Sequence, residues 1–245
     1  MMLSPRRAWA EDPTTPVRGT FLVASRSLRD PNFRETVVLV LEYSGEGAVG
    51  LVVNRPSEIP LSRLIPYIAE LRERNDTVYI GGPVEPLRMT FLFRSSRAQE
   101  NALHVFDDVW ASSSFDLLEH TLKRGRSPIR VLSGYAGWGP YQLDAEIGRG
   151  DWRVVAARAE EVFTLEPGEL WRELIQKVEL RTVHVQKGEV LSSARSPTTE
   201  GAKHWVAFGS IKLAGSEEKG ILLNEKLQYG VRELSNRLVP KVPPK

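Results

Sequence analysis

Short runs of β-branched and aromatic residues, each bounded by Gly, Pro, Asn or Asp, recur through the first half of the chain. Such runs are typical of β-strands, because branched and aromatic side chains pack well on a pleated surface. The pattern predicts strands at Thr20–Ala24, Thr36–Tyr43, Ala48–Val53, Thr77–Ile80, Met89–Phe93 and Ile129–Ser133.

Apolar residues at helical spacing interrupt and follow these strands. The spacing predicts helices over about residues 61–71, 113–125, 140–148 and 170–178. Pro66 should kink the first of these helices, and Pro140 suits the first turn of the third. Ser113 with Asp116 resembles a capping box for the second. The order of strands and helices is not a regular βαβ alternation, so the pattern favours a mixed α+β fold over a doubly wound sheet.

Composition is that of an ordinary globular protein, with 41% hydrophobic and 26% charged residues in a chain of 245. No apolar run reaches the roughly 18 residues of a membrane span. Lys and Arg total 33 against 31 for Asp and Glu, a net charge of +2, so direct nucleic-acid binding is not expected from charge. Cysteine is absent, which excludes disulfides, thiolate nucleophiles and Cys-bearing metal sites.

Basic residues divide the chain into parts of different character, because Arg dominates up to about residue 182 and Lys after it. We expect a disordered leader over residues 1–17, a main domain over 18–182 and an extension over 183–245. In the extension, a polar, turn-rich stretch predicts a flexible loop at about 192–204.

The leader carries the small-x-small pattern of a signal-peptidase site at Ala8-Trp9-Ala10, but the apolar segment that should precede it is missing. We expect a cytoplasmic protein. The alternative is export, if the true start lies upstream and a signal peptide ends at Ala10.

The C-terminal tail predicts an amphipathic helix over about residues 217–239. Its apolar residues fall on one stripe, and Pro240 should end it. The stripe comprises Leu223, Leu227, Val231, Leu234 and Leu238. An isolated helix of this length is marginal in water, so the stripe should be buried against the main domain or, in a homodimer, against the same helix of a second subunit.

Glycine-rich segments are the main candidates for a binding site. Gly45 to Gly50 matches G-x-G-x-x-G, but a strand-like run follows it, so it predicts a turn between two strands and no dinucleotide site. Gly81-Gly82-Pro83-Val84 follows a strand and could cradle an anion, or could simply allow two backbones to approach closely. Gly134 to Pro140 lies between a strand and a helix start, where Tyr135 and Trp138 form either a ligand wall or packing over a loop.

We expect the two glycine-rich loops to converge on one concavity. The candidate pocket residues are Asn54, Arg55, Gly81, Gly82, Pro83, Tyr135, Gly137, Trp138 and Gln142.

Catalytic and metal-binding motifs are scarce, so no catalytic residue, metal or cofactor is assigned. The sequence has no G-x-S-x-G, H-E-x-x-H or P-loop motif. His104 with Asp107 and Asp108 is a weak metal candidate. The basic residues from Lys123 to Arg126, with Arg130, predict a solvated loop.

Several strings, taken in order, give the chain a resemblance to the YqgE/AlgH family of bacterial proteins over about residues 18–182. They are Gly19–Ala24, Asp30–Phe33, Thr36–Leu39, Gly47–Pro56, Gly81–Val84 and Gly134–Ile147. The resemblance implies a single mixed α/β domain with a bifurcated, partly barrel-like sheet flanked by helices. It implies no established activity, only a proposed role in transcriptional regulation.

Two positions depart from that family's usual pattern. Tyr141 stands where the family usually has Gly, so the helix start should be reshaped. Phe93-Arg94 stands where it usually has Leu-His, so any role of that His does not carry over.

Two functional hypotheses follow. The first is a non-enzymatic protein that binds an unknown small ligand or protein partner and acts as a regulator. The alternative is a hydrolase or transferase acting on a phosphorylated or acidic small molecule. The lack of a nucleophile–base pair favours the first.

Overall fold

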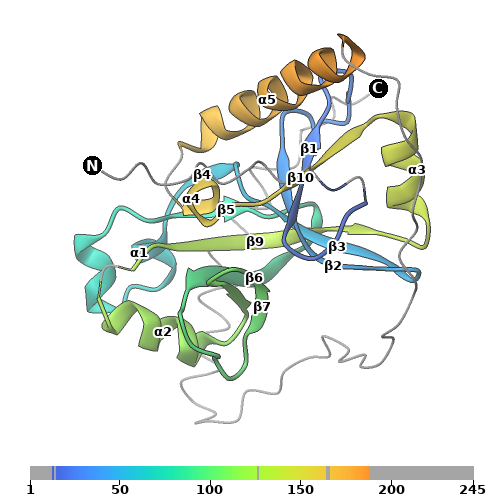
Figure 1. Ribbon diagram of the computed structural model, residues 1–245. Coiled ribbons are helices and arrows are strands. Elements are labelled where there is room, and N and C mark those ends of the chain that lie inside the picture. Colours follow the sequence, from blue (N-terminus) through green and yellow to red (C-terminus); the bar gives the residue numbers. More distant parts are fainter. Residues whose placement is uncertain (1–12, 14, 126, 164–165, 188–245) are drawn as a thin grey trace, which may run out of the picture.

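A computed structural model describes residues 13, 15–125, 127–163 and 166–187, with side chains up to residue 180 (Figure 1). Most of the expected leader lies outside the described residues. The loop expected at about 192–204 and the helix expected at about 217–239 also lie outside them, so both stay predictions.

In this part of the chain, ten strands join in one sheet that is antiparallel except at one pairing. The strands are β1 (Thr20–Ala24), β2 (Val37–Ser44), β3 (Gly47–Val52), β4 (Pro56–Pro60), β5 (Thr77–Ile80), β6 (Val84–Arg94), β7 (Leu103–Phe106), β8 (Val109–Ser112), β9 (Ile129–Trp138) and β10 (Trp152–Ala156). Their main spatial order is β10-β1-β2-β3-β9-β6-β8-β7.

Strand β9 is where the sheet branches. Along one edge it pairs with β6, from Ile129 to Tyr135. Along the other edge, β9 pairs first with β5 in parallel, at residues 131–133, and then with β3 in antiparallel fashion, at residues 136–138. Strand β4 attaches to β5 off the main path. The sheet is therefore bifurcated and does not close into a barrel, which agrees with the mixed α+β fold expected from the sequence.

Helices flank this sheet. They are α1 (Leu61–Leu64), a 3-10 turn η1 (Ala69–Glu73), α2 (Phe115–Lys123), α3 (Gln142–Arg149), α4 (Ala159–Phe163) and α5 (Pro167–Lys187). Helix α5 packs on β1, and the indole N–H of Trp171 donates to the carbonyl oxygen of Ala24 at 2.7 Å. No helix in the described residues is long and apolar enough to cross a membrane.

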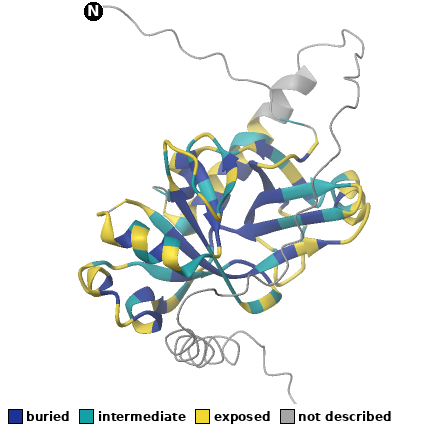
Figure 2. Cartoon of the chain, turned by 90° about the horizontal axis from the view of Figure 1, so that it is seen from below, coloured by how far each residue is buried: buried dark blue, intermediate teal, exposed yellow. Residues whose placement is uncertain are grey.

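Two apolar clusters form the core, and they lie on opposite faces of the sheet where β6 and β9 pair. The first joins β1, β2 and β3 to α5, and the second joins β6 and β9 to α1, η1 and α2. Neighbouring residues of β9 divide between them: Leu132 belongs to the first and Val131 to the second, because successive side chains of a strand point to opposite faces. Figure 2 shows this buried material running along the central strands, with exposed residues at turns and outer helix surfaces.

The bounds predicted for β1 and β5 are those that the structure shows. The hairpin between β2 and β3, with its turn at Gly45 and Glu46, is also confirmed. Other predictions were wrong. β6 and β9 extend well past the predicted segments, and four strands were not predicted at all: β4, β7, β8 and β10.

Helix predictions need several corrections: α4 was not predicted, and α5 extends beyond both ends of the range expected for it, 170–178. The helix expected over 61–71 divides into α1 and η1 around Pro66, whose missing N–H and ring prevent a continuous helix. Ser114, not Ser113, caps α2, since its Oγ accepts from the Leu117 N–H at 3.3 Å. Helix α3 begins after Tyr141 and is capped by Gly150.

Candidate functional site

Gly81 and Gly82 lie directly against the backbone of β9. A Cβ atom at Gly82 would overlap the main chain of Tyr135, and one at Gly81 would overlap the carbonyl oxygen of Gly134. Gly82 also has a φ of 154° and Gly134 one of 73°, values that favour glycine. Of the two alternatives for these glycines, the close approach of two backbones is what the structure shows.

Residues Gly134 to Trp138 are part of β9 and not a loop. The glycines therefore allow a long strand to cross close to the Gly81-Gly82 segment. The sequence prediction of a free loop was wrong because glycine-rich runs usually break strands, whereas here β3 and β6 supply pairing partners.

Tyr135 and Gly137 share one face of β9. The Tyr135 ring would lie 3.4 Å from a Cβ atom at Gly137. Its hydroxyl donates to Glu85 Oε1 at 3.3 Å, and the Arg88 guanidinium lies over the ring at 5.4 Å. Burial, with a contribution from the Glu85 carboxylate, raises the pKa of the Tyr135 phenol. Pro83 is exposed close by.

Trp138 points to the opposite face, into an aromatic cluster. Its ring stacks on Phe33 with 6.0 Å between centroids and meets Trp152 edge-on at 6.0 Å. Glu146 Oε2 accepts the indole N–H of both tryptophans at 2.8 Å. Gln142 joins this group, since its Nε2 donates to Glu146 Oε1 at 3.0 Å.

Asn54 and Arg55 hold the turn before β2. Asn54 Oδ1 accepts from the Val37 N–H at 2.8 Å. Arg55 donates to the carbonyl oxygens of Pro31, Asn32 and Arg34. Burial lowers the pKa of the Arg55 guanidinium. The three carbonyl oxygens take the place of the water molecules that would otherwise solvate this group.

The nine predicted pocket residues thus fall into separate groups. Gly81 and Gly82 lie against the main chain of β9, and Gly137 lies beside the Tyr135 ring. Trp138 and Gln142 meet through Glu146. The hydrogen-bonding groups described for Asn54, Arg55, Trp138 and Gln142 serve the fold itself. A shared ligand pocket lined by all nine residues stays a prediction.

A cavity of about 390 Å³, which the sequence did not indicate, opens between the end of β6 and α2. It is lined by Phe93, Arg94, Ser95, Ser96, Arg97, Gln99, His120, Thr121, Arg124 and Ser127. The lining comes from three places: the end of β6 and the segment after it, the last turn of α2, and the connection from α2 to β9. We call this the β6–α2 cavity.

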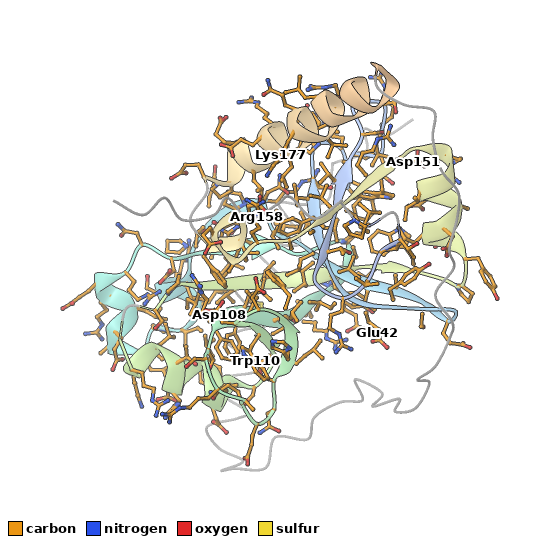
Figure 3. All side chains as sticks on the ribbon, viewed as in Figure 1. Glu42, Asp108, Trp110, Asp151, Arg158 and Lys177 are labelled. Carbon is orange, nitrogen blue, oxygen red and sulfur yellow. The ribbon has the colours of Figure 1, made fainter. Side chains whose placement is uncertain are left out.

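Hydrogen bonds shape the first wall of the β6–α2 cavity. The Ser95 carbonyl oxygen accepts from the Trp110 indole N–H at 3.0 Å, and Ser95 Oγ accepts from Gln99 Nε2 at 2.8 Å. Arg94 Nε donates to Asp108 Oδ2 at 2.7 Å, and this bond raises the pKa of the Arg94 guanidinium. Asp108 and Trp110 lie together beside the β6–β7 segment (Figure 3).

The second wall is the end of α2. Thr121 Oγ1 donates to the carbonyl oxygen of Leu117 at 2.7 Å, four residues earlier in the helix. Arg74 supports the connection that follows, because its guanidinium donates to the carbonyl oxygens of Gly125 and Ser127 at 3.4 and 3.2 Å.

The β6–α2 cavity is basic, with three arginines and one histidine in its lining and no carboxylate among the residues that line it. Arg124 belongs to the basic run that the sequence analysis assigned to a solvated loop. The basic run was the sequence feature that could have indicated the cavity. The opposite wall, at the end of β6, lies some thirty residues earlier in the chain, so the run alone did not show a cavity.

The weak metal candidate has a structural explanation. His104 Nε2 is 2.8 Å from the carbonyl oxygen of Asp107, and its ring lies 4.8 Å from that of Trp110. The described residues contain no group of three or more His, Cys, Asp or Glu side chains placed to hold a metal ion.

Comparisons with known proteins show which family the chain resembles. A model of AlgH-like proteins matches residues 21–182. A UPF0301 protein of Myxococcus xanthus is 40% identical over 154 residues, covering 61% of this chain and 84% of the relative. One of Chlorobaculum tepidum is 32% identical over 186 residues, covering 75% and 94%.

Solved structures agree with the fold. The solution structure of the AlgH protein from Pseudomonas aeruginosa is 26% identical and matches with a TM-score of 0.56, covering 77% of this chain and 100% of that one. A crystal structure of a protein from Corynebacterium diphtheriae, 23% identical, matches with a TM-score of 0.59, covering 66% and 87%. The chain belongs to the AlgH-like family.

Proposed function

We propose that this AlgH-like protein is a non-enzymatic regulatory protein that binds a small ligand in the β6–α2 cavity. The observation that supports this most directly is a cavity of about 390 Å³ lined by guanidinium, hydroxyl and amide groups. That volume is within the range of small-molecule sites, which is about 300–1,000 Å³. The lining is polar except for Phe93, so the ligand that it suits is a polar one that can form hydrogen bonds with several of these groups.

The same lining argues against covalent catalysis. A serine or threonine nucleophile needs a base within hydrogen-bonding distance. Among the described residues, no hydrogen bond joins His120 to a hydroxyl, and the Thr121 hydroxyl is already committed to the Leu117 carbonyl oxygen. These groups can contact a ligand, but they are not arranged to activate one another.

Native mass spectrometry of freshly purified full-length protein, followed by thermal-shift screening of phosphorylated, carboxylated, neutral and cationic small molecules, tests the proposal. Ser96 is exposed and lines the cavity, so Ser96→Trp should fill it without disturbing the core. Ala98→Trp, at an exposed position of the same segment outside the lining, is the matched control.

Wild type and Ala98→Trp should show the same bound species or thermal shift, and Ser96→Trp should lose it. Binding that survives Ser96→Trp unchanged would overturn the assignment to this cavity. If no compound shifts the wild type and no bound species is seen, the binding function itself is rejected.

A hydrolase or transferase acting on a phosphorylated or acidic small molecule is the second candidate. His120 favours it, because an imidazole in a basic cavity is suited to acid–base chemistry. Hydrolysis of p-nitrophenyl phosphate by the wild type, lost in His120→Gln, would support this candidate over a binding role.

A further inference from the structure

The charges in the β6–α2 cavity are not all neutralised by the protein. Arg94 is paired with Asp108 at 2.7 Å and lies 3.9 Å from Glu160. Arg97 and Arg124 also line the cavity, and neither forms an ion pair within the described residues. The two guanidinium groups contributed by opposite walls are therefore available to a ligand.

Neutral donors accompany these charges. The Ser96 and Ser127 hydroxyls line the cavity and make no side-chain hydrogen bond within the described part of the chain. Ser95 is different, since its Oγ donates to the Arg97 carbonyl oxygen at 2.8 Å and shapes the turn. Two serines and two arginines whose side chains have no hydrogen-bond or ion-pair partner among the described residues thus line the same cavity.

One feature opposes an anion here. The last turn of α2 carries a partial negative charge from its free carbonyl groups, about half an elementary charge. Arg74 offsets part of this effect by donating to Gly125 and Ser127, and it is itself balanced by Asp76. Two full positive charges at Arg97 and Arg124 outweigh what remains.

We propose that the β6–α2 cavity binds a phosphate group, as free phosphate or as the phosphate monoester of a small molecule, between Arg97 and Arg124. This inference rests on the binding function proposed above and names the chemistry of its ligand. Guanidinium groups match the oxygens of a phosphate in pairs of parallel hydrogen bonds. The volume of about 390 Å³ fits a small phosphorylated molecule.

Isothermal titration calorimetry on the full-length protein tests the inference with inorganic phosphate, glycerol 3-phosphate and glycerol as probes. Both phosphates should bind, glycerol should not, and affinity should fall as NaCl is raised, because salt screens exposed charges. Equal affinity for the two phosphates identifies free phosphate as sufficient. Tighter binding of the ester shows that the cavity also contacts the rest of the molecule, and both results support the inference.

Arg97→Gln and Arg124→Gln remove one unpaired charge each from the cavity. Either should weaken phosphate binding by roughly tenfold or more, the usual worth of a charge-assisted hydrogen bond. Arg29→Gln is the control, because Arg29 is exposed in the segment between β1 and β2, outside the lining. Melting temperatures of all three variants should match the wild type.

Phosphate that fails to bind, or that binds equally well to all three variants, would overturn the inference. The binding function can stand separately: a co-purified ligand lost in Ser96→Trp but kept in both cavity arginine variants would show that the cavity takes a ligand of another chemistry. If phosphate does not bind and no ligand is lost in Ser96→Trp, both proposals are rejected together.

Discussion

Tyr141 holds a left-handed backbone conformation, with a φ of 59° and a ψ of 0°, directly before α3. Its side chain has no packing to compensate, since 74% of the residue is exposed. A non-glycine residue in this region costs about 1–2 kcal/mol. The departure from glycine noted in the sequence is therefore a strained, exposed aromatic side chain at a helix start.

Tyr141→Gly should raise the free energy of unfolding by up to about 1 kcal/mol, because relief of strain exceeds the entropy gained by the unfolded chain. Urea denaturation measures this. Ala145→Gly, at an exposed position within α3, is the control and should lower stability by about 1 kcal/mol. Loss of stability in both variants would show that Tyr141 is not strained.

Glu161 is buried, and burial raises the pKa of its carboxyl group above the ordinary value. Lys177 Nζ, 3.5 Å from Oε1, and the Arg158 N–H, which donates to Oε2 at 3.1 Å, offset this only in part. Figure 3 labels Arg158 and Lys177, which lie in the upper half of that view. A carboxyl group with a raised pKa in the folded state binds a proton more readily than it does in the unfolded state.

The pH dependence follows with a definite sign. As pH rises from the unfolded pKa, about 4.3, through the higher folded pKa, the wild type loses stability. Glu161→Gln mimics the protonated form, so its stability relative to the wild type should increase over that window and then level off. Urea denaturation across pH 4–8 measures this difference.

Glu173→Gln supplies the comparison, because Glu173 is exposed on α5. A Glu161→Gln difference that stays as flat with pH as that of Glu173→Gln would contradict the role given to burial.

At the scale of elements, the start of α2 depends on one serine out of a run of three. Ser114 Oγ accepts the Leu117 N–H and satisfies a donor that the helix cannot pair itself. Ser113 makes only a 3.5 Å contact with Thr90 Oγ1.

Ser114→Ala should lower the free energy of unfolding by about 1 kcal/mol, the usual cost of losing such a cap. Ser113→Ala should change it by less than about 0.5 kcal/mol. Thermal or urea denaturation of both variants measures the contrast. Equal effects would contradict the assignment of the cap to Ser114, and a larger effect of Ser113→Ala would favour Ser113, as the sequence alone suggested.

Strands that depend on pairing with a distant segment were harder to predict than strands with a strong local pattern. Strand β1 reads as one apolar run and was predicted with its observed bounds. Strand β10 is exposed or half-buried at several positions, and its pairing with β1, from Trp152 opposite Ala24 to Ala156 opposite Thr20, is what makes it a strand. Such pairing depends on residues far away in the chain and leaves little local signal.

At the scale of the whole molecule, β9 connects the two apolar clusters. Leu132 is fully buried in the first and Val131 almost fully buried in the second. Loss of packing on one face should therefore weaken both halves of the domain.

Leu132→Ala should lower the free energy of unfolding by about 2–5 kcal/mol. Hydrogen exchange followed by mass spectrometry should show faster exchange in α2, beside the second cluster, as well as in β1. Val154→Ala, at a half-buried position of the edge strand β10, should have a smaller effect. Faster exchange confined to β1, β10 and α5 would show two independently unfolding parts.

The sequence alone determined the fold class, the family resemblance, the strands β1 and β5 and the hairpin at Gly45, because these depend on local hydrophobic patterns and turn chemistry. It also singled out the basic run that includes Arg124, but only as a solvated loop. Only the tertiary structure showed why glycine is needed at 81, 82 and 134. The segment at Gly81 and Gly82 passes so close to β9 at Gly134 and Tyr135 that a side chain at any of the three glycines would overlap the facing main chain. The tertiary structure also decided that Tyr135 and Trp138 face opposite sides of one strand, and that Arg97 and Arg124 share a cavity. Those relations join segments distant in the chain, and no local pattern records them.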